Sequence, residues 1–361
     1  MSGLVALPPQ PAGVVWPTED WPEGEFPPGV ELGALLDDVF DADGPLAETY
    51  AVLVVHRGRI VAERYEGALE HFDRPPTPVN ADTPLLSWSM AKSMLHAAVG
   101  LLVGDGKLDI DAPGAVPEWA ESSDPRHAIT LRQLLAMRDG LAFVEDYVDD
   151  RISDTMQMLF GDGQADMAHF AADRPLAAPP GTRFNYSSGT SNIISGVVAR
   201  TVGPGESYAR FLHSRLFAPI GMKSADPEFD EAGTWVASST LRAIGRDYAR
   251  FGLLYLRDGM WDGVRLLPSG WVDYGRTMVS VDTSEDPPSP YGAHWLGVRG
   301  ETLDTLSPLG TFRASGYGAQ TITICPALDL IVVRLGNTAY EREDNLIPWR
   351  AAMVDAFARA R

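Results

Sequence analysis

Cysteine is almost absent from this chain, which has only Cys325 in 361 residues. An intrachain disulfide is therefore excluded, and Cys325, inside the apolar run TITICPALDLIVV, is expected to be a small core residue. No run approaches the roughly 18 apolar residues of a membrane helix. The amino terminus also lacks the basic start and apolar core of a signal peptide. These absences predict a soluble, cytoplasmic protein with no membrane partner.

Patterns that bind metals or phosphates are missing as well. The seven histidines are scattered, without H-x-H or H-E-x-x-H spacing, and no glycine-rich phosphate loop occurs. We therefore expect no metal and no cofactor. The formal net charge is −20. Such a field repels phosphate backbones and anionic membranes, so nucleic acid is not expected as a partner, and the acidity is read as serving solubility.

The chain is long enough to bury a large core, in one domain or in two lobes. Residues 1–31 carry seven prolines and predict an extended arm that packs on the body through Trp16, Trp21 and Phe26. A helix is expected at 31–43, followed by a β-hairpin around His56-Arg57-Gly58-Arg59. The hairpin strands are expected at Tyr50–Val55 and Ile60–Tyr65.

Helical patterns dominate the middle of the chain and strand patterns return near its end. The expected helices are one that begins at Ser89, Thr130–Met137 with Thr130 as N-cap, Ser188–Val202, Ser207–Phe217, Leu241–Leu256 and a closing helix over Leu346–Ala360. The expected late strands are Tyr291–Val298, Ala319–Cys325 and Leu330–Leu335. We thus predict an α+β fold, with an antiparallel sheet built from both chain ends and a large, mainly helical insertion. The sheet lobe would comprise 32–84 and 286–361, the helical lobe 85–285, and the active site would lie between them.

Ser89 and Lys92 open the apolar stretch SMAKSMLHAAVGLLV. On a helix they lie one turn apart on the same face. A serine hydroxyl is a poor nucleophile until a base takes its proton, and lysine can be that base only when it is neutral. Burial and the positive end of a helix dipole both disfavour the ammonium form. An isolated S-x-x-K is more often a solvated helix start, but the apolar residues that flank this one favour a catalytic role for Ser89 and Lys92.

Tyr186 is a candidate for the proton carrier that such a pair needs. It lies in GTRFNYSSGTSN, at an expected loop-to-helix junction. A tyrosinate stabilised by a lysine ammonium can act as a base and then as an acid. The alternative is that Tyr186 anchors the loop and Ser188 caps the helix.

Taken together, these blocks resemble the β-lactamase-related serine hydrolases, and most closely the branch of 6-aminohexanoate-dimer hydrolases and related carboxylesterases. The resemblance covers nearly the whole chain. It runs through LPPQPAGVVWPTEDWP, SWSMAKS, LLAMRDGLAFVEDYVDD, FNYSSGTSNIISGVVAR, RDYARFGLLYLRDGMWDGVRLLPSGWV and SGYGAQTITICPALDLIVVRLGN. It implies the β-lactamase/transpeptidase fold.

The resemblance also implies roles for individual residues. Ser89 would be the acylated nucleophile, Lys92 its base and Tyr186 the general acid and base. The oxyanion hole would use the backbone N–H of Ser89 and that of Tyr317, to within one residue. Tyr147 matches a tyrosine that contacts substrate in the amide-hydrolysing members.

Two departures from the family pattern narrow the expected substrates. Ala314, Ser315 and Gly316 occupy the strand where β-lactamases carry K-T-G, so the lysine and threonine that help hold a β-lactam carboxylate are missing. The Tyr-x-Asn element ends in Ser188, so the carboxamide that would hold a substrate amide is missing unless Asn192 replaces it. Ser188, Ser315 and Gly316 remain the candidate substrate-binding residues beside Tyr147.

We therefore expect a serine hydrolase that cleaves small linear amides or carboxylic esters through an acyl-enzyme. One alternative is a short-chain carboxylesterase with weak β-lactamase or D-aminopeptidase side activity. Another is a penicillin-binding sensor that acylates without turnover, and a third is an inactive scaffold. The sequence does not fix the oligomeric state, and a homodimer stays open.

Three further groups have two readings each. Asp146, Asp149 and Asp150 would either attract a substrate ammonium group or form a solvated face. Trp88 and Trp295 would either line an acyl pocket or pack in the core. The block RDYARFGLLYLRDG reads as a buried helix with salt bridges.

Overall fold

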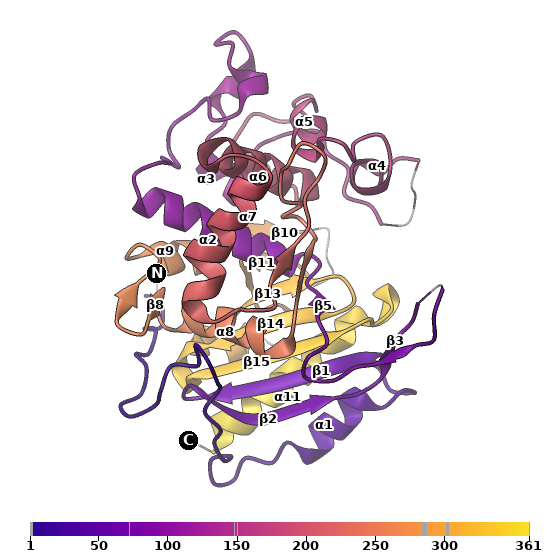
Figure 1. Cartoon of the computed structure of the whole chain (residues 1–361), viewed down its shortest axis with the longest axis vertical. Helices are drawn as coiled ribbons and strands as arrows, with labels where there is room; N and C mark the ends of the chain where they lie inside the picture. The colour runs from indigo at the N-terminus through magenta and orange to yellow at the C-terminus, as the bar shows by residue number, and fades with distance from the viewer. Residues whose placement is uncertain are drawn as a thin grey trace.

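The computed structural model describes residues 3–71, 73–147, 149, 151–283, 287–300 and 303–360. Its centre is one eight-stranded antiparallel sheet (Figure 1). In spatial order the strands are β10 (Ser280–Asp282), β11 (Ser289–Tyr291), β12 (Leu296–Gly297), β13 (Phe312–Gly316), β14 (Gln320–Cys325), β15 (Leu330–Gly336), β1 (Thr49–His56) and β2 (Arg59–Tyr65). Because β1 pairs with β15, the sheet joins both ends of the chain, and the predicted fold class is confirmed.

The expected hairpin is formed by β1 and β2. Its two turn residues, Arg57 and Gly58, have φ of 51° and 74°. Positive φ at both central residues matches the twist of a type I′ turn, which explains the glycine. The shorter strands lie outside the main sheet: β3 (Ala68–Leu69) with β4 (Thr77–Pro78), β5 (Leu85–Leu86) with β7 (Leu241–Ala243) and β6 (Asp226–Pro227), and β8 (Met260–Trp261) with β9 (Val264–Arg265).

Helices cover both faces of the sheet. Alternate residues of β1 point to opposite faces: Val52 and Val54 join the cluster that contains α1 and α11, whereas Leu53 and Val55 join the main core with α2 and α8. The helices are α1 (Gly33–Phe40), α2 (Met90–Gly104), α3 (Leu131–Leu135), α4 (Asp154–Phe160), α5 (Met167–Ala172), α6 (Ser188–Val202), α7 (Glu206–Leu212), α8 (Gly245–Leu256), α9 (Trp271–Arg276), α10 (Leu303–Leu306) and α11 (Leu346–Arg359).

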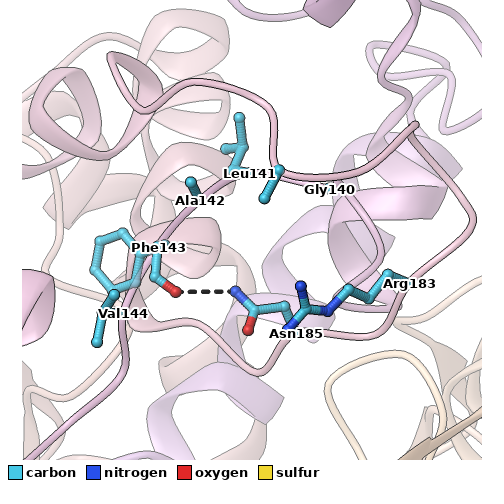
Figure 2. A pocket seen from close by; sticks show the side chains of 8 residues that line it. Gly140, Leu141, Ala142, Phe143, Val144, Arg183 and Asn185 are labelled. Carbon is cyan, nitrogen blue, oxygen red and sulfur yellow. Dashed lines mark hydrogen bonds between the residues drawn. The ribbon is translucent and has the colours of Figure 1, made fainter.

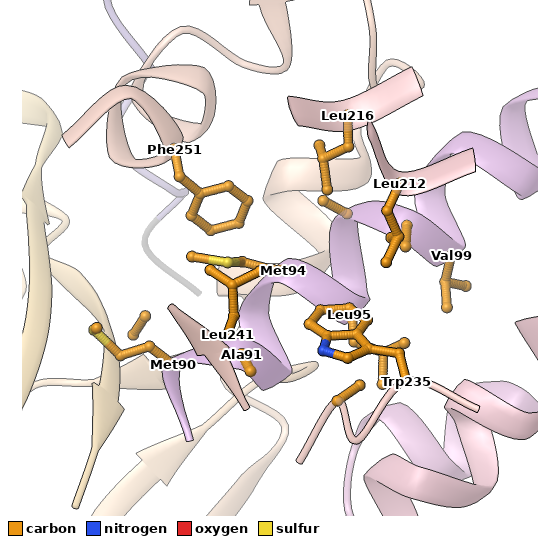
Figure 3. Packing of buried hydrophobic residues seen from close by; sticks show 14 of the residues in the cluster. Met90, Ala91, Met94, Leu95, Val99, Leu212, Leu216, Trp235, Leu241 and Phe251 are labelled. Carbon is orange, nitrogen blue, oxygen red and sulfur yellow. The ribbon is translucent and has the colours of Figure 1, made fainter. Parts of the chain in front are cut away.

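Helix α2 runs through the middle of the molecule. Every residue from Met90 to Leu102 is buried, which explains why the stretch is apolar on all sides. Figure 3 shows Met94 and Leu95 packed among large side chains that include Trp235 and Phe251. Since α2 contacts both α6 and β13, it connects the helical part of the chain to the sheet.

The amino-terminal arm is held by side chains of the body, as expected for two of its three aromatic residues. Trp21 is buried in the main core, and the ring of Trp16 lies 5.1 Å from that of Trp261. Phe26 is 38% exposed, so the prediction that it anchors the arm was wrong. Arg250 of α8 instead donates to the backbone oxygens of the arm, with Nε 2.6 Å from the Pro17 oxygen.

Several of the predicted helices are confirmed, and two segments differ from the prediction. Thr130 caps α3 in a capping box with Gln133, and the buried α8 carries the expected salt bridges. Leu241–Ala243 is not helical, because it pairs with Leu85–Leu86, and α8 begins only at Gly245. The segment expected at Ser207–Phe217 is α7 followed by one π-helical turn over His213–Phe217.

The strand expected over Tyr291–Val298 is divided. β11 ends at Tyr291 and β12 begins at Leu296, because His294 takes a φ of 57° in the turn between them. The sheet begins with β10 at Ser280, ahead of the lobe boundary expected between 285 and 286, which lies outside the described residues. None of the helices in the described ranges is long and apolar enough to cross a membrane.

Candidate active site

Ser89 lies at the end of a tight turn between β5 and α2. Hydrogen bonds fix the turn: Ser87 N donates to the Leu241 oxygen at 2.8 Å, and Leu241 N donates to Ser87 Oγ at 3.2 Å. Trp88 has a φ of 45°, which is strained for a bulky side chain. Ser89 then takes helical dihedral angles as the residue before α2, and it is half-buried. The turn therefore presents Ser89 at the positive end of α2.

Lys92 is one helical turn further on and is 2% exposed. Its Nζ lies 3.0 Å from Ser89 Oγ, 3.2 Å from Ser188 Oγ and 2.8 Å from the backbone oxygen of Ser238. Burial lowers the pKa of Lys92 to about 8, while the Glu145 carboxylate acts in the opposite direction. A lysine with this pKa holds a substantial neutral fraction near pH 8.

Ser238 and Asn192 support Lys92, and of the two only Asn192 is a candidate in the sequence. Asn192 is fully buried on α6, where its Oδ1 accepts from Ser238 N at 3.1 Å. Its carboxamide is engaged inside the core and does not replace the one missing at Ser188. It fixes the turn whose carbonyl, that of Ser238, accepts a hydrogen bond from Lys92 Nζ. Nothing in the segment ASSTL marks Ser238, because the contact depends only on how the chain folds back.

The structure brings both Tyr186 and Ser188, the first residue of α6, to Lys92. The Tyr186 ring centre lies 4.9 Å from Lys92 Nζ, and its edge meets Tyr291 at 82°. Ser187, and not Ser188, caps α6, since its Oγ accepts from Thr190 N at 3.0 Å. The alternative reading, in which Ser188 caps this helix, is therefore wrong, and the Ser188 hydroxyl faces Lys92.

The end of β13 lies directly against the Ser89 turn. A Cβ atom added at Gly316 would meet the Ser87 oxygen at 2.4 Å and Ser89 N at 3.0 Å. Only glycine allows this approach. Ser315, one residue earlier, pairs with Thr321 on β14 and is half-buried.

Tyr317 follows Gly316. The residue after it, Gly318, is hydrogen-bonded through both its backbone N–H and its backbone oxygen. Gly318 N donates to Glu343 Oε1 at 2.5 Å, and Arg334 Nη1 donates to the Gly318 oxygen at 2.7 Å. Burial raises the pKa of Glu343 to about 7 and lowers that of Arg334 to about 9. Glu343 and Arg334 therefore fix the loop that carries Tyr317, whose backbone N–H is the expected second oxyanion donor.

Four aromatic side chains surround the mouth of the site. The Tyr317 ring lies 5.5 Å from Trp88, 6.0 Å from Tyr147 and 6.3 Å from Tyr340, centre to centre. Tyr147 is 40% exposed, and its hydroxyl donates to Glu145. Burial of this hydroxyl and the Glu145 charge raise the pKa of Tyr147 well above its ordinary value. We name Trp88, Tyr147, Tyr317 and Tyr340 the aromatic rim.

The remaining sequence candidates have structural roles. Trp295 is fully buried and stacks with Phe251, which makes it a core residue. Asp149 is ion-paired with Arg151 at 2.9 Å, and Asp146 Oδ1 accepts from Asp149 N. Asp150 lies outside the described residues.

Two cavities are lined by a residue of the site or by its neighbours in the chain. One, of about 190 Å³, is shown in Figure 2, where Asn185 Nδ2 donates to the Phe143 oxygen at 3.0 Å. Its lining residues are Gly140, Leu141, Ala142, Phe143, Val144, Ala177, Arg183 and Asn185. The other, of about 270 Å³, opens beside Tyr317 and is lined further by Ala47, Glu48, Asn337, Thr338, Ala339 and Arg342. Among the described residues, no group of three or more histidine, cysteine or acidic side chains is arranged to hold a metal ion.

The fold, the contact between Ser89 and the buried Lys92, and the comparisons with known proteins together define a serine hydrolase that acts on amide or ester bonds. Within that class, the chain belongs to the beta-lactamase family, whose model matches residues 43–356.

Three relatives illustrate the range of this family. The 6-aminohexanoate-dimer hydrolase of Paenarthrobacter ureafaciens is 28% identical over 331 residues, which span 86% of this chain and 78% of that protein. Esterase EstB of Burkholderia gladioli is 27% identical over 319 residues, 81% of this chain and 73% of that one. A family VIII carboxylesterase structure has a TM-score of 0.70 at 17% identity, over 94% of this chain and 99% of that one, and shows the same fold.

Proposed function

We propose that this protein hydrolyses small linear amides or short-chain carboxylic esters, with Ser89 as the acylated nucleophile. The observation that carries the proposal is the 3.0 Å contact between Ser89 Oγ and the Nζ of a buried lysine whose pKa is lowered to about 8. Neutral Lys92 takes the Ser89 proton as Oγ attacks the substrate carbonyl carbon. The backbone N–H groups of Ser89 and Tyr317 hold the oxyanion.

Tyr186 completes the proton transfers in this proposal. It passes the proton received by Lys92 to the leaving amine or alcohol, and the acyl group stays on Ser89. Water then attacks the acyl-enzyme, with the same groups working in reverse. The position of the Tyr186 ring over Lys92 supports this role.

The substrate class rests on the surroundings of Ser89. The aromatic rim offers apolar contact to a linear chain, as an aminocaproate oligomer or a short-chain ester would have. The names of the two relatives, an aminohexanoate-dimer hydrolase and an esterase, support the same two classes.

A cytoplasmic location stays a prediction of the amino-terminal sequence.

Steady-state turnover of three probes tests this proposal: p-nitrophenyl acetate, a chromogenic β-lactam and the linear dimer of 6-aminohexanoate. We expect turnover of the ester or the dimer, weaker turnover of the β-lactam, and a loss of at least about a thousandfold in Ser89→Ala. Ser93→Ala, on the same helix, is the matched control, since Ser93 Oγ only donates to the buried His294 oxygen. A stoichiometric burst without turnover would indicate a penicillin-binding sensor, and undiminished turnover in Ser89→Ala would refute the mechanism.

A further inference from the structure

Glu145 lies at the centre of the site although no motif marks it. Four donors from three segments converge on its carboxylate. Ser188 donates twice, from N to Oε2 at 2.7 Å and from Oγ to Oε1 at 2.6 Å. Thr155 Oγ1 donates to Oε2 at 2.7 Å, and the Tyr147 hydroxyl donates to Oε1. A half-buried carboxylate with four donors is held in one orientation.

The Ser188 hydroxyl has a single proton, and its contact with Glu145 commits that proton. Its oxygen can then only accept a hydrogen bond from Lys92 Nζ, which lies 3.2 Å away. A neutral lysine amine has two N–H donors and one lone pair. Here the two donors have two acceptors, the Ser238 oxygen and Ser188 Oγ. The lone pair is left for the third neighbour, the Ser89 hydroxyl at 3.0 Å.

We propose that Glu145 is a positioning residue of the catalytic site, which directs the lone pair of Lys92 toward Ser89 by accepting the hydrogen bond of the Ser188 hydroxyl. The inference deepens the proposed function and rests on it for its effect on rate. Without Glu145, the Ser188 hydroxyl can rotate and donate to Lys92, and it then competes with Ser89 for the lone pair. Glu145 acts through Ser188 and does not contact the reacting atoms.

The charge of Glu145 has a second, measurable effect. An anion near Lys92 favours its ammonium form, so removing the anion lowers the pKa of Lys92 further. The other titratable groups that face Lys92 are Tyr186, from the loop before α6, and His294, from the turn between β11 and β12. Burial lowers the pKa of His294 to about 3, so His294 is neutral near pH 7 and does not mask the effect.

The test compares Glu145→Gln, which removes the charge at nearly constant shape, with Glu145→Ala, which also removes the acceptor. Thr155→Val is the matched control, because it removes one donor to the same carboxylate and leaves Ser188 in place. Circular dichroism and thermal unfolding establish that each variant is folded. If Glu145→Ala does not fold, the comparison of Glu145→Gln with Thr155→Val still tests whether Glu145 positions Lys92.

The first readout is the pKa of Lys92 by NMR of [13C]lysine-labelled protein. The chain has only three lysines, Lys92, Lys107 and Lys223, so the resonances can be assigned with single substitutions. We expect a midpoint near 8 in the parent and in Thr155→Val. In Glu145→Gln we expect a midpoint lower by about one pH unit. This measurement needs no substrate.

The second readout is the pH profile of kcat/KM for p-nitrophenyl acetate. Lys92 must be neutral to act, so the rate rises with pH through the pKa of Lys92. In Glu145→Gln the rising limb should move to lower pH, and in Glu145→Ala the plateau should fall at least about tenfold. An unchanged Lys92 midpoint and an unchanged limb in a folded Glu145→Gln protein would overturn the inference. A shifted midpoint in a protein that hydrolyses none of the probes would instead refute the proposed function.

Discussion

Two buried cations, Lys92 on α2 and Arg250 on α8, are held in opposite ways. Arg250 is 5% exposed, with Nη1 2.6 Å from Asp247 Oδ1 and with two backbone oxygens of the arm as its other partners. Lys92 is more deeply buried, yet its direct hydrogen-bond partners are two hydroxyls and a carbonyl. The ion pair with Asp247 holds Arg250 in place, and Arg250 in turn fixes the arm. Among the described residues no carboxylate is ion-paired with Lys92, and burial lowers its pKa to about 8, which leaves a proton that can move.

The largest expected effect comes from Lys92→Met, which should separate function from stability. We expect the rate of p-nitrophenyl acetate hydrolysis to fall by about a thousandfold or more. The free energy of unfolding in urea should rise by about 2 kcal/mol at pH 7, because a buried ammonium is removed. The folded pKa of Lys92 lies below its ordinary 10.5, so this stabilisation is fully present below pH 8 and fades as the pH rises toward 10.5.

Lys107→Met, at an exposed position three residues after the end of α2, is the control and should change neither quantity. A Lys92→Met protein that is both inactive and strongly destabilised would contradict the proposed difference between Lys92 and Arg250, since it would make Lys92 a structural residue like Arg250.

Arg250→Met should have the opposite outcome. It leaves the Asp247 carboxylate buried without its cation and the Pro17 and Glu19 oxygens without their donor. We expect a loss of about 3 kcal/mol in the free energy of unfolding, with kcat of the folded protein within about twofold of the parent. Arg265→Met, in the exposed pair with Asp258, should cost less than about 1 kcal/mol. If Arg250→Met and Arg265→Met lower the free energy of unfolding by the same amount, burial does not determine how much an ion pair stabilises this protein.

The smallest of these effects is expected for Gly316→Ala, which tests the contact between β13 and the Ser89 turn. The added Cβ would meet backbone atoms of Ser87 and Ser89, which cannot move aside as a flexible side chain can. We expect kcat to fall by about a hundredfold as the oxyanion site opens, with a smaller change in KM. Gly33→Ala meets nothing within 4 Å and serves as control. Normal kcat in Gly316→Ala would place the second oxyanion donor elsewhere.

Local signals in the sequence were sufficient for much of the fold. The hairpin follows from Arg57-Gly58, α3 from its Thr130 cap, and α6 was predicted at its observed bounds, Ser188–Val202. Leu241–Ala243 was misread because a short apolar run has no period of its own and pairs with Leu85–Leu86 only in the folded chain.

The site was predictable in the same uneven way. Ser89 and Lys92 are one helical turn apart, so their contact follows from spacing alone. Glu145 and Ser188 are 43 residues apart, and Lys92 and Ser238 are 146 apart. No spacing rule reaches such distances, so the residues that tune Lys92 could be found only in the structure.

The most direct test of the account is to trap the acyl group. Rapid acid quenching of the protein during turnover of a slow p-nitrophenyl ester, followed by proteolysis and mass spectrometry, locates any covalent acyl adduct. The account predicts one acyl group per chain on the peptide that contains Ser89. The adduct should be absent in Ser89→Ala and at least about a hundredfold slower to form in Lys92→Met. An adduct on another residue, or turnover with no adduct at any quench time, would contradict it.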